Sequence, residues 1–204
     1  MRGLSHDYMS YYCKNVEMIN ERGCFMARTE TDAHICDEPL CAAIIKMYKD
    51  VKTAVDIGCG NGKYTRNLIA AGIPCKGYDG SPLTPEITDG LCEVMDFSIP
   101  SDIGQFDLVL CLEVGEHIPK QYEQVFIDNI CRAADKHVCL SWALEKQDGW
   151  GHINCQNNDY VISEMRKRGF TYKPVETQIL RDSTGLNEYI WWFKNTIMIF
   201  KNGT

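Results

Sequence analysis

The sequence predicts an α/β fold in which a doubly wound, seven-stranded, mostly parallel sheet is covered by helices on both faces. Short apolar runs alternate along the 204-residue chain with helix-like segments. A glycine-rich turn follows the first run and opens a helix, and an acidic residue follows each of the next two runs. Strands that alternate with helices form parallel sheets buried on both faces.

The expected strands are the apolar runs themselves. They are Thr53–Ile57, Pro74–Tyr78, Leu91–Met95, Phe106–Leu112, Val138–Trp142, Phe170–Lys173 and Thr196–Phe200. Capping residues and glycines mark three helices between them. These helices run from Asp37 to about Lys49, from near Gly62 to Gly72, and over Asp159–Arg168 up to Gly169.

We expect one domain, because no repeat, low-complexity tract or flexible linker divides residues 1–204. Residues 51–204 would form the α/β core, and residues 1–50 a helical cap or lid. Within this cap, Ser5–Arg22 has a helical pattern with clustered tyrosines. A face packed on the domain and a lid over the active site both fit that pattern.

Composition restricts the partners and the compartment. The chain has 21 basic and 28 acidic residues, a formal net charge of −7, and no basic stripe, which argues against tight binding to bare nucleic acid. Its 11 cysteines lack paired metal-type spacing, which favours free thiols in a reducing compartment. No segment has the length of a signal peptide or a membrane span, so we expect a cytoplasmic protein.

The strongest motif lies after the first expected strand, where Asp56 to Gly62 read DxGxGxG. Glycine permits a sharp strand-to-helix turn and the close approach of a ligand to the backbone. A dinucleotide fingerprint would need glycine at position 63, which is Lys63, and the spacing of a phosphate-binding Walker loop is absent. Further acids, Asp79 and Asp96, end the second and third strands, where a carboxylate can accept hydrogen bonds from ribose hydroxyls.

This pattern resembles motif I of class I methyltransferases, over roughly Val51–Phe200. The resemblance implies a Rossmann-like fold, a methyltransferase activity and S-adenosyl-L-methionine as cofactor. It also implies that Asp56 binds the methionine end, Asp79 the ribose, and Asp96 with Phe97 the adenine. The full set of cofactor residues implied is Asp56, Gly58, Cys59, Gly60, Asp79, Gly80, Asp96, Phe97 and Glu113.

The segment after the fourth strand carries the acceptor-side prediction. If it forms one helical turn, Glu113, Glu116 and His117 lie at i, i+3 and i+4 on one side. ExxEH here resembles ubiquinone-biosynthesis O-methyltransferases and Hen-type RNA 2′-O-methyltransferases, which implies a bound divalent cation. His152, in the loop after strand five, matches the second metal histidine of the Hen type by order.

The predicted metal ligands are therefore Glu113, Glu116, His117 and His152, a set that suits magnesium, manganese, cobalt or iron. Without a metal, His117 or His152 is a candidate general base and hence a catalytic residue, because an imidazole can accept a proton near neutral pH. Among nearby aromatics, Trp150 is the pocket candidate, whereas the residues 191–193 are expected to pack in the core.

These residues lead to an S-adenosylmethionine-dependent methyltransferase acting on an oxygen of a hydroxylated small molecule. RNA 2′-O-methylation is the alternative among enzymes, and the net charge stands against it. A catalytically silent cofactor-binding protein that regulates a partner is the alternative outside enzymes.

Overall fold

The computed structural model describes residues 19–26, 34–185 and 190–203. The elements are α2 (Glu38–Met47), β1 (Ala54–Ile57), α3 (Lys63–Ala70), β2 (Cys75–Asp79), α4 (Thr84–Ile87), β3 (Glu93–Val94), β4 (Phe106–Cys111), the 3-10 turns η1 (Gly115–His117) and η2 (Lys120–Tyr122), α5 (Glu123–Ala133), β5 (Ala134–Leu140), α6 (Asn158–Lys167), β6 (Phe170–Tyr172), α7 (Pro174–Asp182), α8 (Phe193–Thr196) and β7 (Met198–Asn202). Each predicted strand has a counterpart, and the three predicted helices are α2, α3 and α6.

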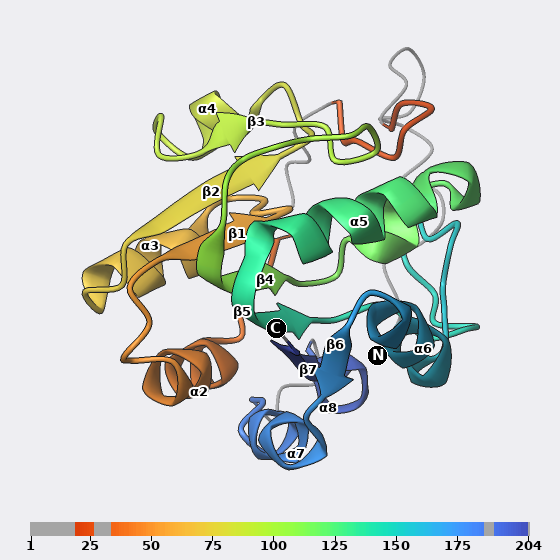
Figure 1. The fold of residues 1–204 in the computed structure, drawn as a ribbon. Helices are drawn as coiled ribbons and strands as arrows, with labels where there is room; N and C mark the ends of the chain where they lie inside the picture. Colours follow the sequence, from red (N-terminus) through yellow and green to blue (C-terminus); the bar gives the residue numbers. More distant parts are fainter. Residues whose placement is uncertain (1–18, 27–33, 186–189, 204) are drawn as a thin grey trace, which may run out of the picture.

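The predicted fold class is confirmed by the sheet topology. The strands lie in the order β3-β2-β1-β4-β5-β7-β6 (Figure 1). Pairing is parallel from β3 through β5, and β7 is antiparallel to both β5 and β6. The order reverses between β1 and β4, which is the switch point where open α/β sheets bind ligands.

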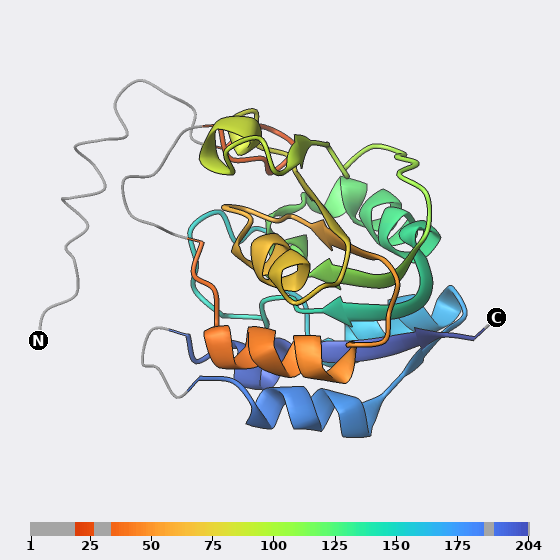
Figure 2. The same cartoon turned by 90° about the vertical axis from the view of Figure 1, so that its left-hand side faces the viewer.

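Helices cover both faces of the sheet (Figures 1 and 2). On one face α5 and α6 pack in a cluster that contains Val109 of β4 and Phe126 of α5. On the other face α2, α3 and α7 pack in a second cluster that contains Leu108 of β4, Leu40 of α2 and Leu180 of α7. Helix α2, which falls within residues 1–50, therefore shares the hydrophobic core of the sheet.

Strand β5 begins four residues earlier than the predicted Val138–Trp142 and ends two residues earlier. Helix α5 passes into the strand at Ala134 without a loop. The polar start of the strand resembles a turn in the sequence, but Lys136 forms an ion pair with Asp107 of β4 at 2.8 Å. Cross-strand pairing therefore extends the sheet where hydrophobicity alone predicts a turn.

The predicted helix Ser5–Arg22 lies outside the described residues except for its last four, and there the prediction is wrong. Ile19 forms an isolated β-bridge with Phe25 around a tight turn. The Asn20 side chain accepts the amide of Cys24 at 3.0 Å, and Gly23 has φ +87°. A side-chain cap and a left-handed glycine thus stop the helical pattern. None of the helices in the described ranges has the length and apolar character to cross a membrane.

Candidate active site

A cavity of about 660 Å³ lies at the carboxyl ends of the central strands. This volume is typical of small-molecule sites, which span about 300–1,000 Å³. Each residue predicted to bind cofactor lines it: Asp56, Gly58, Cys59, Gly60, Asp79, Gly80, Asp96, Phe97 and Glu113. His117 and His152 line the same cavity, whereas Glu116 is fully buried. The predicted cofactor and acceptor sides therefore share one space.

The glycine-rich turn after β1 requires its glycines. The φ angles are +75° at Gly58, +53° at Gly60 and +71° at Gly62, a region that disfavours other residues. The amides of Gly58 and Cys59 both donate to the carbonyl oxygen of Tyr78 in β2, at 2.7 and 3.0 Å. The turn is thus held against the neighbouring strand at the floor of the cavity.

Asp79 organises this turn as well as facing the cavity. One carboxylate oxygen accepts the amide of Gly60 at 2.9 Å, and the other accepts the amide of Ser81 at 2.9 Å. Each carboxylate oxygen has a second lone pair available for a ligand hydroxyl. The sequence predicts the ribose role of Asp79 but not its role in fixing the glycine turn.

Asp56 lies at the end of β1 and is 3% exposed. Its Oδ2 accepts a hydrogen bond from the Thr65 hydroxyl of α3 at 2.8 Å. Burial raises the pKa of Asp56 to about 6; the Thr65 hydrogen bond opposes this rise, and the neighbouring Asp79 carboxylate adds to it. Asp56 is consequently a carboxyl group that changes charge just below neutral pH.

Asp96 and Phe97 lie beyond β3. Asp96 accepts the amide of Ser98 at 2.8 Å and forms an ion pair with Arg22 at 3.5 Å. Phe97 packs edge-on against Tyr78 with ring centroids 6.2 Å apart. The positive charge that pairs with Asp96 comes from Arg22 in the N-terminal turn, 32 residues before the first residue of β1, and no motif in the sequence marks it.

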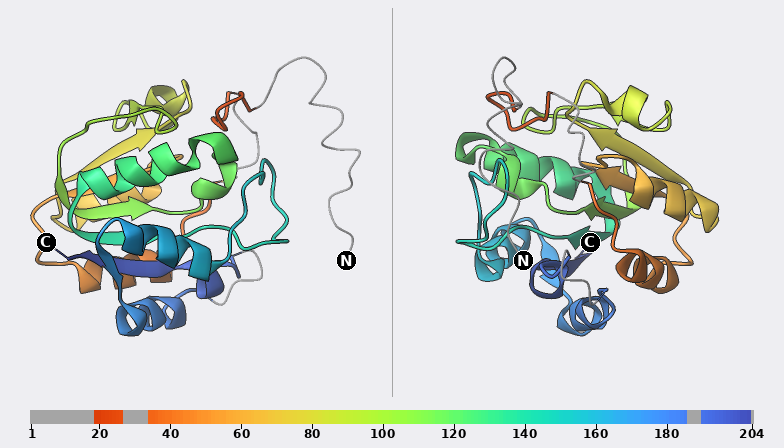
Figure 3. Two further views of the ribbon diagram at one scale, coloured as in Figure 1. Left: turned by 45° about the vertical axis from the view of Figure 1, so that its right-hand side comes forward. Right: turned by 180° about the vertical axis from the view of Figure 1, so that it is seen from behind.

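The turn Ile19–Met26 lies over the cavity, beside the long loop between β5 and α6 (Figure 3). A Cβ on Gly23 would lie 2.0 Å from the carbonyl oxygen of His117, so this glycine allows a close approach. Phe25 packs edge-on against His117 and Trp150, at centroid distances of 5.2 and 5.1 Å. The described end of the N-terminal segment therefore contacts the acceptor side directly.

Glu113 departs from the predicted helical turn. It has φ +55°, and the 3-10 turn η1 starts two residues later, so the predicted single helical turn does not form. The Glu113 carboxylate lies near that of Glu116 but is not part of the group in which Glu116, His117 and His152 meet. The Glu113 carboxylate accepts hydrogen bonds from the Thr196 hydroxyl at 3.2 Å and the Gln147 amide at 3.4 Å. The structure thus places Glu113 at the cavity wall, held by residues from distant segments.

The other three predicted metal residues do meet. One ligand atom each from Glu116, His117 and His152 lies within 4.8 Å of the other two. Ligands about 2.0–2.2 Å from one ion are separated by roughly 3–4.4 Å, so a small closure would bring these atoms into one shell. His152 Nε2 is 4.0 Å from Glu116 Oε1.

Both imidazoles are oriented by backbone carbonyls. His117 Nδ1 lies 3.2 Å from the carbonyl oxygen of Gly151, and His152 Nδ1 lies 3.1 Å from that of Gln147. Each Nδ1 therefore carries the proton in the neutral ring, which leaves the lone pair on Nε2. Burial, with a contribution from His152, lowers the pKa of His117 to about 4, so its ring is neutral at pH 7.

Glu116 is a buried carboxyl group without a hydrogen-bond partner. Neither Oε1 nor Oε2 accepts a hydrogen bond of good geometry from the described residues, although the backbone amides of Glu116 and Ala143 lie close enough to lower the pKa in part. Burial and the nearby Glu113 carboxylate raise the pKa of Glu116 well above its usual range. An unpaired buried polar group destabilises the fold, so its presence here calls for a functional partner.

The tryptophans divide between core and cavity. Trp150 lines the cavity, as predicted. Trp142 is fully buried and packs on Gly115. The expectation that residues 191–193 pack in the core is wrong for Trp191, which is 56% exposed. Phe193 is buried in the core and Trp192 packs against it, and both also line the cavity. The short helix α8 turns this run toward the cavity, a change of direction that hydrophobicity does not reveal.

Other cavity residues have no motif that marks them. They include Cys24, Phe25, His34, Gln147 and Trp192. They come from the N-terminal turn, the chain ahead of α2, the long loop after β5 and the segment before α8. Tertiary packing brings these segments together at the cavity, and no spacing of residues in the sequence predicts that they meet.

A mostly parallel sheet with this strand order, a left-handed glycine turn after β1 and carboxylates at successive strand ends are typical of methyltransferase domains. The chain belongs to the methyltransferase domain family, whose profile matches residues 33–175.

Comparisons with known proteins agree with this class. The chain is 34% identical over 99 residues to the probable chloroplastic tocopherol O-methyltransferase of Oryza sativa subsp. japonica, covering 42% of this chain and 27% of that protein. It is 31% identical over 110 residues to the chloroplastic tocopherol O-methyltransferase of Arabidopsis thaliana, covering 46% of this chain and 31% of that protein. The match thus spans less than a third of either relative.

The fold is similar to that of magnesium protoporphyrin IX methyltransferase from Synechocystis PCC 6803, solved with bound SAH. The TM-score is 0.62 at 18% identity, with 81% of each chain covered. At this level of identity the likeness shows the fold.

Proposed function

We propose that this enzyme methylates a hydroxyl oxygen of a small molecule and that Glu116, His117 and His152 hold a divalent cation beside the methyl donor. The observation that carries the proposal is the buried Glu116 carboxyl group, which lacks a hydrogen-bond partner among the described residues and faces His152 across 4.0 Å.

The cofactor side fits S-adenosylmethionine, which supplies a methyl group already activated for displacement. Asp56 is placed to attract its ammonium group, and Asp79 can accept hydrogen bonds from its ribose. A Cβ at Gly60 would lie 2.6 Å from His34 Nδ1, so the lack of a side chain lets the His34 ring lie against the glycine turn at the cavity. The protein then has to align an acceptor oxygen and remove its proton.

The acceptor side fits a cation through its donor set. Metal-bound histidines commonly donate their second ring N–H to a carbonyl oxygen, as His117 and His152 do here. A carboxylate with two imidazoles suits manganese, cobalt or iron, and also magnesium with further oxygen ligands. When bound, such a cation lowers the pKa of an acceptor hydroxyl and holds its oxygen.

A ligand role suits His117 better than a general-base role. With its pKa lowered to about 4 by burial, the ring is a weak proton acceptor at neutral pH. The same neutral ring offers its Nε2 lone pair to a cation without first losing a proton. His152 remains the candidate base if the cation is absent.

Aromatic side chains favour a flat, hydroxylated acceptor. Phe25, Trp150 and Trp192 line the cavity, and Phe25 packs against both His117 and Trp150. Stacked or edge-on contacts with an acceptor ring would orient its hydroxyl. The relatives from rice and Arabidopsis carry names as O-methyltransferases of tocopherol, a small molecule, which supports this class of acceptor.

The decisive experiment measures transfer of a labelled methyl group from S-adenosylmethionine to a panel of acceptors, with and without manganese. The panel contains catechols, monophenols, an aromatic amine and a short RNA duplex. We expect transfer to a catechol or phenol that requires the metal. Labelling of RNA would move the assignment to 2′-O-methylation, and binding of cofactor without transfer to any acceptor would support a regulatory protein.

Cofactor affinity should rise with pH between 5 and 7. Burial raises the pKa of Asp56 to about 6 in the free enzyme, so protons occupy the carboxyl group below that pH. An ammonium group needs the ionised form, and affinity should therefore fall about tenfold for each pH unit below 6. Calorimetry from pH 5 to 8 tests this. Asp56→Asn should bind more weakly and with a flat profile, and a parallel slope in both proteins would contradict the assignment.

The compartment stays a prediction. The ten cysteines among the described residues carry free thiols, which suits the predicted reducing environment. The two relatives are named as chloroplastic proteins, so a cytoplasmic location needs direct imaging of the tagged protein.

A further inference from the structure

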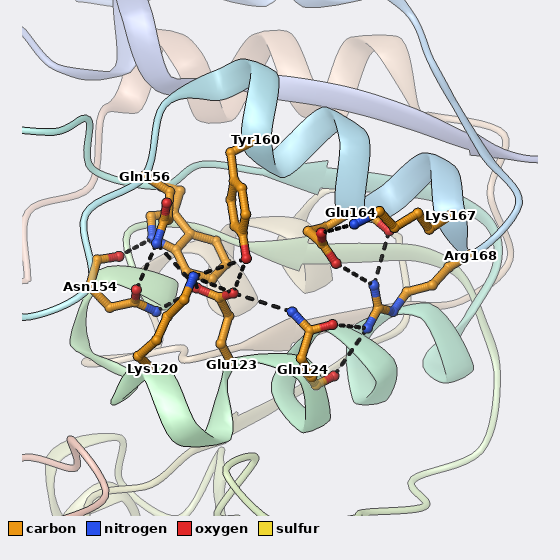
Figure 4. Close-up of polar contacts among 10 residues, drawn as sticks. Lys120, Glu123, Gln124, Asn154, Gln156, Tyr160, Glu164, Lys167 and Arg168 are labelled. Atoms are coloured by element: carbon orange, nitrogen blue, oxygen red, sulfur yellow. Dashed lines mark hydrogen bonds and ion pairs between the residues drawn. The ribbon is translucent and has the colours of Figure 1, made fainter.

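A fully buried carboxylate lies outside the cavity, at Glu123, the first residue of α5 (Figure 4). Lys120 Nζ donates to its two oxygens at 2.8 and 2.9 Å, and the Tyr160 hydroxyl of α6 donates to it as well. Asn154 Nδ2 donates at 2.9 Å and Gln156 Nε2 at 3.4 Å. One carboxylate thus joins η2, α5, α6 and the loop between β5 and α6.

Glu123 is held in its ionised form. Burial alone would raise the pKa of Glu123, but the hydrogen bonds from Lys120, Tyr160 and Asn154 lower it below its usual value. A neutral amide at this position would have one acceptor oxygen and would leave part of this donor cluster without a partner. The cluster therefore depends on the charge of Glu123 and not on its size.

Asn154 connects this cluster to the predicted metal site. The backbone N–H groups of Ile153 and Asn154 both donate to the backbone carbonyl oxygen of Glu116, each at 2.9 Å. The backbone carbonyl oxygen of Asn154 accepts the indole N–H of Trp142 at 2.7 Å. His152 lies two residues before Asn154, so the anchored stretch ends beside the ring that faces Glu116. This loop is fixed to the η1 turn at the point where the two imidazoles and the carboxylate meet.

We propose that Glu123 is a positioning residue: its charge anchors Asn154 and thereby sets His152 opposite Glu116 and His117. This assignment rests on the proposed function, because the anchored loop carries His152, one of the proposed cation ligands. Glu123 does not line the cavity, so it acts through Asn154 and not by contact with substrate or cofactor.

The test compares Glu123→Gln with Glu164→Gln, using manganese as the metal probe. Glu164 is a matched control because it is 4% exposed and accepts hydrogen bonds from Lys167 Nζ at 2.5 Å and Arg168 Nη1 at 3.1 Å. None of its hydrogen bonds or ion pairs within the described ranges reaches the 152–156 loop (Figure 4). Both changes remove one charge from a buried cluster. Their effects on the metal site should nevertheless differ.

In Glu123→Gln the dissociation constant for manganese should rise about 10- to 100-fold, the usual effect of losing an outer-shell partner. Amide hydrogen exchange at Ile153 and Asn154 should accelerate at least tenfold, and affinity for S-adenosylmethionine should stay within threefold. Glu164→Gln should leave all three values at those of the parent. Equal changes in both variants, or no change in either, would overturn the proposal.

Asn154→Ser decides the case if Glu123→Gln fails to fold, because it keeps the contacts of Lys120 and Tyr160 with Glu123 and removes the link to the loop. It should reproduce the loss of manganese affinity and the faster exchange.

Hydrogen exchange also distinguishes a failure of the Glu123 anchor from a failure of the proposed metal function. If the parent protein binds no manganese, the proposed metal function fails, and exchange at Ile153 and Asn154 still tests the anchor. If the parent binds manganese tightly, and manganese affinity and amide exchange are unchanged in Glu123→Gln and Asn154→Ser, only the role of Glu123 as an anchor is rejected.

Discussion

Replacing Glu116 by methionine should reduce kcat about 100- to 1,000-fold while the affinity for S-adenosylmethionine stays within threefold. A cation that activates the acceptor contributes several kcal/mol, and about 1.4 kcal/mol corresponds to each tenfold change in rate. Glu116 is fully buried and lines no part of the cofactor cavity. Its loss should therefore act on transfer and not on the binding of the methyl donor.

In the absence of metal, Glu116→Met should be more stable than the parent protein, although it is less active. The Glu116 carboxyl group lacks a hydrogen-bond partner among the described residues, so an apolar side chain of similar length should raise the free energy of unfolding by about 1–3 kcal/mol. The backbone bonds from Ile153 and Asn154 to the Glu116 carbonyl oxygen remain. A residue with a purely structural role would lower the stability when replaced.

Two measurements complete this test. Excess chelator should lower the activity of the parent to that of Glu116→Met and leave the variant unchanged, because both remove the same cation. His152→Ala should lose activity through weaker metal binding and regain part of it at high manganese concentration. Full activity of the parent in excess chelator would falsify the metal assignment and return His152 to the role of a base.

The fold and the cofactor side were predictable because their signals are local. Each strand is a continuous apolar run, and the turn from Asp56 to Gly62 combines a carboxylate with glycines at a fixed spacing. The alternation of strands and helices then requires that Asp79 and Asp96 reach the same edge of the sheet. Local pattern and topology agree here, so each residue supports the others.

The acceptor side was predictable in part. The ExxEH segment identifies Glu116 and His117, and loop order identifies His152. The left-handed backbone at Glu113 was not predictable, because it depends on Ser141, whose hydroxyl receives the Glu113 amide at 2.8 Å.

The same limit applies to the cover of the cavity and to the Glu123 anchor. The turn Ile19–Met26 and the link between Glu123 and Asn154 join segments that are remote in sequence. Such contacts are set by tertiary packing, and no periodic pattern in the sequence predicts them.

Gly58→Ala should weaken cofactor binding at least tenfold, and Gly72→Ala should leave it unchanged. Both glycines have left-handed backbones, with φ +75° and +86°, so alanine introduces similar backbone strain of about 1 kcal/mol at either position. The surroundings differ. A Cβ on Gly58 would lie 2.3 Å from Val114 Cγ2, whereas a Cβ on Gly72 would meet no atom within 4 Å.

The clash at Gly58 can be relieved only by moving Val114 or the turn itself. Val114 precedes η1, so its displacement disturbs the wall of the cavity between the glycine turn and His117. Adding Val114→Ala to Gly58→Ala removes the two Cγ atoms and should recover part of the lost affinity. Calorimetric titration of the single and double variants, with thermal unfolding as the measure of strain, tests both statements. Equal losses of affinity in Gly58→Ala and Gly72→Ala would mean that backbone strain, and not the fit of the glycine turn against Val114, governs cofactor binding.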